Sequence, residues 1–302
     1  MILKIALIYR ALAAIAAGLL LSACQSAPKL PECTDPIGCV TIPPGEPIKL
    51  AVLQTLTGDS AVIGEDQLKT IELILSRRDY QLLGHPIALQ RENELCTPEG
   101  GANAALRVIA DPQVIAILGT TCSGAAKTAS EIMSKAGLVM ISSANTAPAL
   151  TSVEGIQGDN WHPGYFRVIY NDAIAGRTAA EFAIKKLGIK KAATLDDGEF
   201  YGQQLTSVFA QVFEDLGGEV VLETSLNLDA NDMTPFLEAI DNADAEFVFM
   251  PITASPATRI LEQVSRFPNL VDMNEQGLTF LVGEELIADD FIQAVEENGM
   301  GV

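Results

Sequence analysis

The stretch VIAILGTTCSGAAKTASEIMSKAGLVMIS (residues 114–142) decides the fold of this chain of 302 residues. Its first five residues are all apolar, which is typical of a buried parallel strand. A helical segment over residues 125–136 follows, ends at Gly137, and leads into another strand over residues 138–141. A strand, a helix and a strand in this order predict a βαβ unit, in which the two strands are parallel.

The same alternation of strands and helices extends to both sides of this unit. Two successive blocks of this kind predict an α/β fold with two doubly wound parallel-sheet lobes. We assign residues 48–168 to lobe 1 and residues 169–302 to lobe 2. The first helix of lobe 1, over residues 64–78, has helical periodicity. Its apolar face is expected to be formed by Leu68, Ile71, Ile74 and Leu75. The other predicted strands cover residues 48–53, 87–90, 191–195, 219–226, 247–250 and 279–282, and the other predicted helices cover residues 98–110, 173–187, 203–216, 234–243 and 257–266.

The first residues have the pattern of a lipoprotein export signal. Lys4 and Arg10 give a positive start, an apolar core follows, and the sequence LSAC ends at Cys24. We expect residues 1–23 to be a lipoprotein signal peptide, Cys24 to carry diacylglycerol, and the Pro-, Ser- and Gly-rich residues 24–47 to form a tether. An ordinary signal peptide with a chance cysteine is the alternative. If Cys24 carries lipid, the protein is expected to be a membrane-anchored lipoprotein of the cell envelope, outside the cytoplasm.

The composition narrows the class of partner. The chain has 39 acidic and 19 basic residues, a formal net charge of −20, and a hydrophobic content of 48% that allows a sizeable core. A surface this acidic repels phosphate backbones, so we expect no nucleic-acid partner. It also repels anionic lipid, so membrane attachment is expected through the lipid anchor alone.

The cysteines predict disulfides. With Cys24 assigned to lipid, Cys33, Cys39, Cys96 and Cys122 remain, and an even number in an exported chain indicates two bridges with three possible pairings. Cys33 and Cys39 flank a short loop, so pairing these two is the simplest choice. That choice leaves Cys96 to pair with Cys122.

Two loops of lobe 1 have the composition of an anion site. Residues 119–125 follow a strand and open a helix, and residues 142–148 follow the next strand. In open α/β sheets ligands bind at the carboxyl ends of the strands, and hydroxyls with a helix N-terminus suit a carboxylate. The alternative is that these Ser and Thr side chains only cap helices.

Lobe 2 offers acids at the corresponding places. Asp196, Asp197 and Glu199 follow one strand together with Tyr201, and Glu284 and Glu285 follow another. An acid and a tyrosine opposite an anion site would fit a zwitterion. For Asp196, Asp197 and Glu199 we expect a solvated loop, or a weak cation site, because acidic clusters are usually solvated.

Neither a metal site nor nucleophilic catalysis is favoured. His85 and His162 are far apart in sequence and lack ligand spacing, so no metal and no cofactor is expected. A cysteine hydrolase would use Cys122, but a nucleophile elbow needs Gly two positions earlier and Gly119 is three positions earlier. We therefore expect no enzyme.

Several short segments, in this order and spacing, resemble the type I periplasmic binding proteins, specifically the branched-chain amino acid binding proteins of ABC transporters. The resemblance covers residues 48–302. The segments that carry it are LQTLTG (53–58), ELCTP (94–98), TCSG (121–124), MIS (140–142), TAPALT (146–151), DDG (196–198), YG (201–202) and GE (283–284).

The resemblance implies a ligand site between the two lobes. It pairs Cys96 with Cys122 and places hydroxyls of Ser123 and Thr146 on a ligand carboxylate. The site residues that it implies for the ammonium side are the carbonyl of Ala144, the side chain of Tyr201, and the acid Glu284, or Glu285 beside it. The implied function is capture of an amino acid or similar small zwitterion for a membrane permease of an ABC importer. A ligand-sensing receptor domain without transport is the alternative.

The chain departs from the family pattern in two places. Ile63, Ile252 and Thr253 stand where the family often has aromatic side chains, which implies a wider pocket. Amides, urea-like solutes and aromatic acids therefore stay open beside leucine, isoleucine and valine. The sequence ends at Val302, where family members continue, so we expect the fold to be truncated at its C-terminus.

Overall fold

The computed structural model describes residues 32–34, 39–227, 230–271, 278–283, 286 and 289–297. The chain divides into two compact units, residues 1–39 and residues 40–302. In the first unit, Cys33 is disulfide-bonded to Cys39 with a Cα–Cα distance of 5.7 Å, as predicted. The predictions of a signal peptide and of lipid attachment at Cys24 lie outside the described residues.

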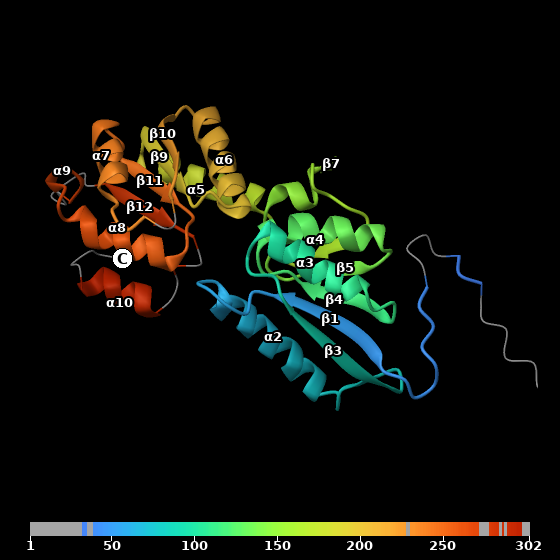
Figure 1. Cartoon of the computed structure of the whole chain (residues 1–302). Helices are drawn as coiled ribbons and strands as arrows, with labels where there is room; N and C mark the ends of the chain where they lie inside the picture. Colours follow the sequence, from blue (N-terminus) through green and yellow to red (C-terminus); the bar gives the residue numbers. More distant parts are fainter. Residues whose placement is uncertain are drawn as a thin grey trace, which may run out of the picture. The chain divides into compact units, whose positions relative to one another are not determined.

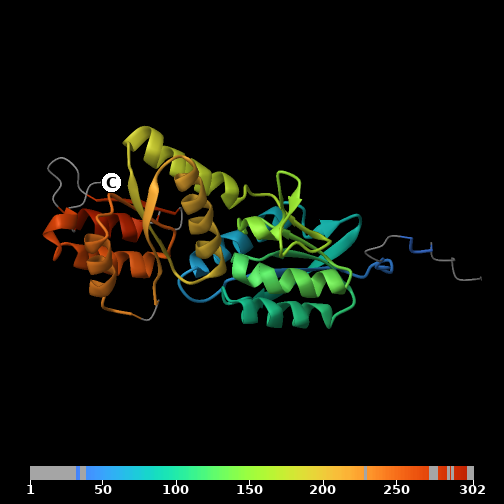
Figure 2. The same ribbon diagram turned by 90° about the horizontal axis from the view of Figure 1, so that it is seen from above.

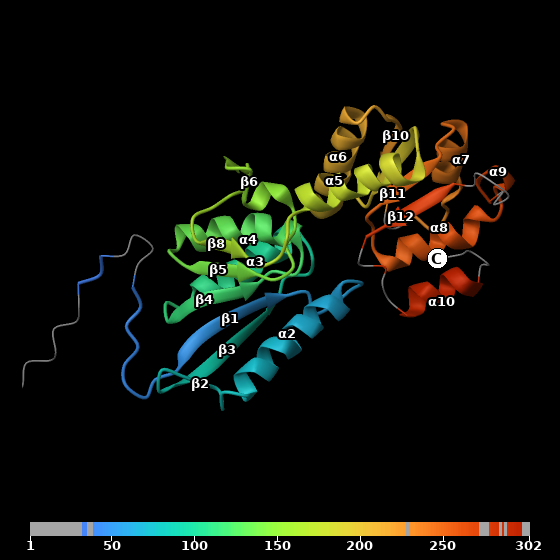
Figure 3. The same cartoon turned by 180° about the vertical axis from the view of Figure 1, so that it is seen from behind.

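The second unit contains a six-stranded sheet in the order β2-β3-β1-β4-β5-β8. All neighbours in it are parallel except the pair β2 and β3. Figures 1 and 3 show β1 between β3 and β4. The strands are β1 (Ile48–Gln54), β2 (Gln81–Leu82), β3 (His85–Asn93), β4 (Val114–Gly119), β5 (Val139–Ser142) and β8 (Tyr165–Arg167).

Helices cover both faces of this sheet, which agrees with the unbroken apolar sequence of β4. On one face α3 (Pro98–Ile109) and α4 (Ser123–Lys135) lie side by side, and on the other α2 (Ala61–Ser76) packs on β1 (Figures 1 and 2). The buried cluster between the sheet and α3 and α4 includes Leu53, Ile117 and Met133. Thr97 caps α3 by accepting a hydrogen bond from the N–H of Gly100 at 2.9 Å.

A parallel four-stranded sheet in the order β10-β9-β11-β12 follows. Phe209, Phe213, Phe247 and Phe249 fill the space between this sheet and α6. A second buried cluster lies between the sheet and α7, α8 and α10. The strands are β9 (Lys191–Asp196), β10 (Glu219–Ser225), β11 (Phe247–Met250) and β12 (Thr279–Val282). The helices are α5 (Asp172–Phe182) with a π-helical continuation (Ala183–Leu187), α6 (Phe200–Asp215), α7 (Thr234–Asn242), α8 (Ala254–Val264), α9 (Pro268–Val271) and α10 (Asp289–Glu297).

The α/β fold with parallel sheets is confirmed, and details differ from prediction. The predicted apolar face of α2 is wrong at Ile74, which is 52% exposed while Leu75 is buried. At 3.6 residues per turn, Leu75 lies within about 20° of Leu68 around the helix, whereas Ile74 is displaced by about 120°. The short strands β6 (Ser152–Val153), β7 (Ile156–Gln157) and β8 were not predicted. Among the described helices, none combines the length and apolar character needed to cross a bilayer.

Candidate functional site

A cleft of about 500 Å³ lies at the carboxyl ends of the strands of the first sheet. Gln54 of β1 pairs in register with Asn93, and Leu53 with Gly119, so the loops after β1, β3 and β4 emerge at the same edge. The volume is in the usual range for small-ligand sites, about 300–1,000 Å³. The second sheet also contributes. The lining residues include Thr55, Asp59, Ile63, Gln67, Leu95, Thr121, Ser123, Ser143, Ala144, Thr146, Ile169, Asp197, Glu199, Tyr201, Pro251, Ile252 and Thr253.

The N-terminal turn of α4 forms one wall of the cleft. Cys122 is its N-cap residue and makes no side-chain hydrogen bond to the turn. Ser123, the first helical residue, is buried, and its Oγ accepts a hydrogen bond from the N–H of Ala147 at 3.4 Å. Because the N-terminus of a helix carries positive partial charge and N–H groups that lack intrahelical partners, this turn suits an anion.

The loop after β5 is held in place beside that turn. Ser142 Oγ accepts hydrogen bonds from the N–H groups of Ala144 at 3.2 Å and Asn145 at 3.0 Å. The guanidinium of Arg167 donates to the carbonyls of Asn145 at 3.1 Å and Ala147 at 3.0 Å. These bonds fix the backbone on which Ala144 and Thr146 face the cleft.

Asn145 joins the two loops. Its Nδ2 donates to the carbonyl of Thr121 at 3.0 Å, and its Oδ1 accepts from Thr120 Oγ1 at 3.1 Å and from Tyr165 Oη at 3.0 Å. Asn145 and Tyr165 are almost fully buried, and burial raises the pKa of the Tyr165 hydroxyl. The hydroxyl therefore stays a neutral donor, and the two loops keep a fixed spacing.

The prediction that the acidic loop at the end of β9 is solvated is wrong for Asp196 and Asp197. Asp196 and Asp197 are buried, and each closes a tight turn: Asp196 Oδ1 accepts from the N–H of Gly198 at 2.8 Å and Asp197 Oδ1 from that of Glu199 at 3.1 Å. Loss of solvent raises the pKa of the Asp197 carboxyl, and the neighbouring charge of Asp196 adds to the rise. Desolvation, followed by the charges of Asp197 and Glu99, also raises the pKa of Glu199.

The acidic loop approaches α4 across the cleft. A Cβ added to Gly124 would lie 3.8 Å from Glu199 Oε2 and 3.7 Å from the Cβ of Phe200. Lys127 on α4 places its ammonium 4.9 Å from the centre of the Phe200 ring. The described lining of the cleft includes three acids, Asp59, Asp197 and Glu199, and no lysine, arginine or histidine. This charge balance favours a ligand that carries a positive group.

Four of the five residues predicted to bind the ligand line this one cleft: Ser123, Ala144, Thr146 and Tyr201. Glu284, the fifth, and Glu285 lie outside the described residues. Ile63, Ile252 and Thr253, predicted to shape the pocket, also line it.

Two other kinds of site were considered from the sequence, a catalytic cysteine and a metal site. Cys122 is disulfide-bonded to Cys96, as predicted, with a Cα–Cα distance of 5.1 Å, so its sulfur is not a free thiol nucleophile. In the part of the chain that the structure describes, no three His, Cys, Asp or Glu side chains are grouped to hold a metal ion.

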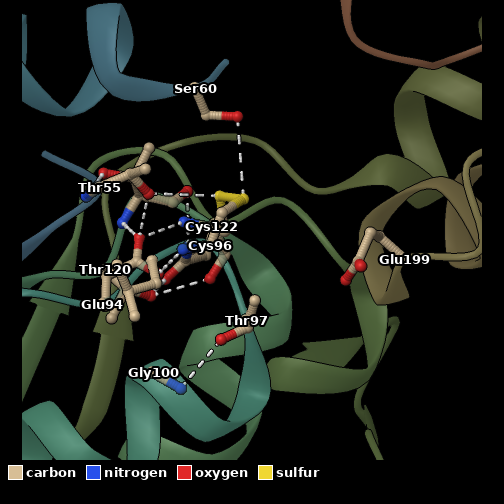
Figure 4. Close-up of a disulfide and its surroundings, with 12 residues drawn as sticks. Thr55, Ser60, Glu94, Cys96, Thr97, Gly100, Thr120, Cys122 and Glu199 are labelled. Carbon is tan, nitrogen blue, oxygen red and sulfur yellow. Dashed lines mark hydrogen bonds between the residues drawn. A yellow bond between two sulfur atoms is a disulfide. The ribbon is translucent and has the colours of Figure 1, made fainter. Parts of the chain in front are cut away.

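Sequence reasoning gave no role to the buried polar residues behind the cleft. Figure 4 shows the carboxylate of Glu94 among Thr55, Cys96 and Cys122. Its Oε1 accepts from Thr55 Oγ1 at 2.6 Å and from the N–H groups of Thr121 at 3.2 Å and Cys122 at 3.1 Å. Its Oε2 accepts from the N–H of Cys96 at 2.8 Å. The sequence signals were the position of Glu94 two residues before a cysteine and its place at the start of the segment ELCTP (94–98).

Comparison with known sequences identifies relatives. Residues 47–284 match the model of a family described as periplasmic binding protein. An amino acid binding protein of Pseudomonas aeruginosa is 27% identical over 209 residues, which are 68% of this chain and 52% of that protein. A Leu/Ile/Val-binding protein of Escherichia coli (strain K12) is 23% identical over 209 residues, 68% of this chain and 54% of that protein. The chain thus spans about half the length of the curated relatives it matches.

Solved structures share the fold. A leucine binding protein from Thermotoga maritima has a TM-score of 0.72 at 23% identity, covering 83% of this chain and 67% of that one. A solute binding protein of an ABC transporter from R. palustris, in complex with 4-hydroxybenzoate, has a TM-score of 0.71 at 20% identity, covering 85% and 67%. The same fold therefore holds ligands with and without an ammonium group.

Proposed function

The chain belongs to the periplasmic binding protein family, and from this premise we propose that it captures an α-amino acid or a similar small zwitterion in the cleft and presents it to the permease of an ABC importer. No covalent chemistry is part of this function. The whole protein would act outside the cytoplasm.

The observation that carries the proposal is the division of charge within the cleft. The N-terminal turn of α4, with the hydroxyls of Ser123 and Thr146, supplies hydrogen-bond donors for a carboxylate. The carbonyl of Ala144 and the acids of the second sheet supply acceptors for an ammonium. Tyr201 would cover the ligand, and Glu284, or Glu285 beside it, is the proposed counter-charge.

The same lining distinguishes an amino acid from a simple aromatic acid. Benzoate-type ligands would bring a further negative charge toward Asp197 and Glu199, and the described lining has no basic side chain to balance it. An α-amino acid brings its own ammonium. The names of the relatives, amino acid binding and Leu/Ile/Val-binding, agree with this preference.

The test compares three compounds that share one hydrocarbon group. L-Leucine, 3-methylbutylamine (no carboxylate) and 4-methylpentanoate (no ammonium) are titrated calorimetrically, after a thermal-shift screen of amino acids, amides and aromatic acids. We expect only the zwitterion to bind among these three, because deleting either charge leaves buried groups of the other kind unpaired. A screen in which benzoate or another acid without an ammonium binds best would contradict the zwitterion while leaving solute binding intact.

Variants locate the site. Thr146→Val and Glu284→Gln should each weaken binding of the best screened amino acid. Ser134→Ala, near the other end of α4 from the cleft, is the matched control and should leave affinity unchanged. Equal affinity in all three variants would place the site elsewhere.

We also propose attachment to the membrane through lipid on Cys24, for which the support is the sequence LSAC after an apolar core. Cys24→Ala should move the protein from the membrane fraction to the soluble fraction. A variant that stays in the membrane fraction would disprove the anchor.

A further inference from the structure

Glu94 is a fully buried carboxylate without a cationic partner. Its side chain has 0% exposure, and all four of its hydrogen-bond donors are neutral: one hydroxyl and three backbone N–H groups. Burying a charge in this way is costly unless hydrogen bonds compensate for the lost water. A residue that only filled space could do so without that cost, so the carboxylate itself has a role here.

The four donors come from three different loops of the cleft. Thr55 follows β1, Cys96 follows β3, and Thr121 and Cys122 follow β4 (Figure 4). Residues from all three loops line the cleft. One carboxylate therefore fixes the relative positions of the carboxyl ends of three neighbouring strands.

Glu94 also decides which N–H groups remain for a ligand. Its Oε1 accepts hydrogen bonds from the N–H groups of Thr121 and Cys122, the two residues directly before the first turn of α4. The N–H groups of the turn itself, beginning with Ser123, point toward the N-terminal end of α4, which borders the cleft.

The disulfide spans two of the same loops. It links the side chains of Cys96 and Cys122, while Glu94 links their backbone N–H groups. Both also contact the loop after β1 (Figure 4): Thr55 Oγ1 donates to Glu94 Oε1 at 2.6 Å and lies 3.5 Å from Cys122 Sγ, and Cys96 Sγ lies 3.8 Å from Ser60 Oγ. The disulfide holds two cysteine side chains near each other, whereas the carboxylate orients the peptide groups.

We propose that Glu94 is a positioning residue that keeps the anion-binding turn of α4 in its ligand-ready arrangement, and that it does so without help from the Cys96–Cys122 disulfide. This inference rests on the proposed function, because the turn that Glu94 holds is the one assigned to the ligand carboxylate. Glu94 itself touches no ligand in this role.

Hydrogen–deuterium exchange of the ligand-free protein tests the positioning directly. In Glu94→Gln the side-chain amide meets the N–H of Cys96 donor to donor, and one charged acceptor is lost. We expect the amides of Cys96, Thr121 and Cys122 to exchange about tenfold faster or more, while amides in the centre of β1 keep their rates. Glu92→Gln is the matched control, because this carboxylate of β3, two residues before Glu94, pairs with Arg107 rather than with the loops.

A variant without the bridge, Cys96→Ala with Cys122→Ala, completes the test. With Glu94 present, the amide of Thr121 should stay within about threefold of its wild-type rate, less than the effect of one typical hydrogen bond. Unchanged exchange in Glu94→Gln, or equally fast exchange in the bridge-free variant, would overturn the inference. Glu94→Asp, which keeps the charge on a shorter side chain, replaces Glu94→Gln if that variant does not fold.

Affinity for L-leucine provides the functional readout. Glu94→Gln should weaken it about tenfold with the disulfide intact, and equal affinity in both proteins would contradict positioning. If wild-type protein does not bind L-leucine, the proposed function fails for that ligand, whereas the exchange experiment, which contains no ligand, still decides the role of Glu94.

Discussion

Replacing Gly101 by alanine should destabilise the protein by forcing α3 and α4 apart beside the candidate site. A Cβ on Gly101 would lie 2.3 Å from the carbonyl oxygen of Ala125 and 2.7 Å from its Cα. Both obstacles are backbone atoms in the first turn of α4, so no side-chain rotation can relieve the overlap. The helices would have to separate by about 1 Å, because carbon and oxygen atoms need a little over 3 Å.

Two opposing contributions determine how much Gly101→Ala changes the free energy of unfolding. Overpacking of a close contact costs about 1–3 kcal/mol, and a backbone obstacle places this case near the upper end. The gain in helix propensity from Gly to Ala is about 1 kcal/mol. We therefore expect a net loss of about 1–2 kcal/mol in the free energy of unfolding. The displaced turn also contains Ser123, so affinity for a carboxylate-bearing ligand should fall as well.

Urea unfolding followed by circular dichroism measures the first effect, and calorimetry with the best screened amino acid measures the second. Gly124→Ala is the matched control, because its Cβ would meet the nearest atoms at 3.7–3.8 Å, an ordinary contact. It should leave stability unchanged or increase it by up to about 1 kcal/mol, the gain in helix propensity. A Gly101→Ala protein as stable as the Gly124→Ala protein would refute the reasoning.

Three further predictions concern stability. Asp197→Asn keeps an acceptor for the N–H of Glu199 and removes a buried carboxyl whose pKa is raised by desolvation. In wild type, the stability that protonation of Asp197 gives is lost as the pH rises through this pKa. Urea unfolding should therefore find the variant more stable than wild type at pH 7 and similar to it near pH 3. Phe209→Ala removes a buried ring stacked on Phe213, Phe247 and Phe249 and should cost about 3–5 kcal/mol in the same assay, whereas a loss below about 1 kcal/mol would show that this cluster is not close-packed. Cys96→Ala with Cys122→Ala opens a loop that the disulfide closes across a sequence separation of 26. In the chain-entropy model this should lower the free energy of unfolding by about 3–4 kcal/mol. An unchanged urea midpoint would contradict that model here.

The fold was predictable because strands inside the sheets, such as β4 and β11, are apolar and because the helices are periodic. The run at residues 114–118 has no polar interruption, and β4 forms there. β8 was missed because it has only three residues and its central residue, Phe166, is 54% exposed at the edge of the sheet. A strand this short is fixed by pairing with β5, which is a tertiary contact and leaves no local pattern.

The candidate site was partly predictable for a related reason. Ser123 begins the helix that follows β4, Ala144 and Thr146 lie in the loop after β5, and parallel strands bring such segments to one edge. The burial of Asp197 was not predictable from its acidic neighbours, because it depends on how the turn after β9 folds back. Glu94 was harder still, since three of its four donors belong to residues more than 25 positions away in the chain.

The disulfide and Glu94 are expected to act on different states of the chain. A disulfide stabilises mainly by restricting the unfolded chain, so its effect appears in the free energy of unfolding and depends little on which way the peptide groups point. Glu94 contributes through hydrogen-bond directions that exist only in the folded state, and its burial makes it a poor source of global stability. Binding of a small ligand benefits from the second kind of restraint, because a turn that is already ordered loses less conformational freedom when the ligand binds. Loss of the disulfide should therefore reduce the free energy of unfolding more than the free energy of ligand binding. Loss of the Glu94 carboxylate should reduce the free energy of ligand binding more than that of unfolding.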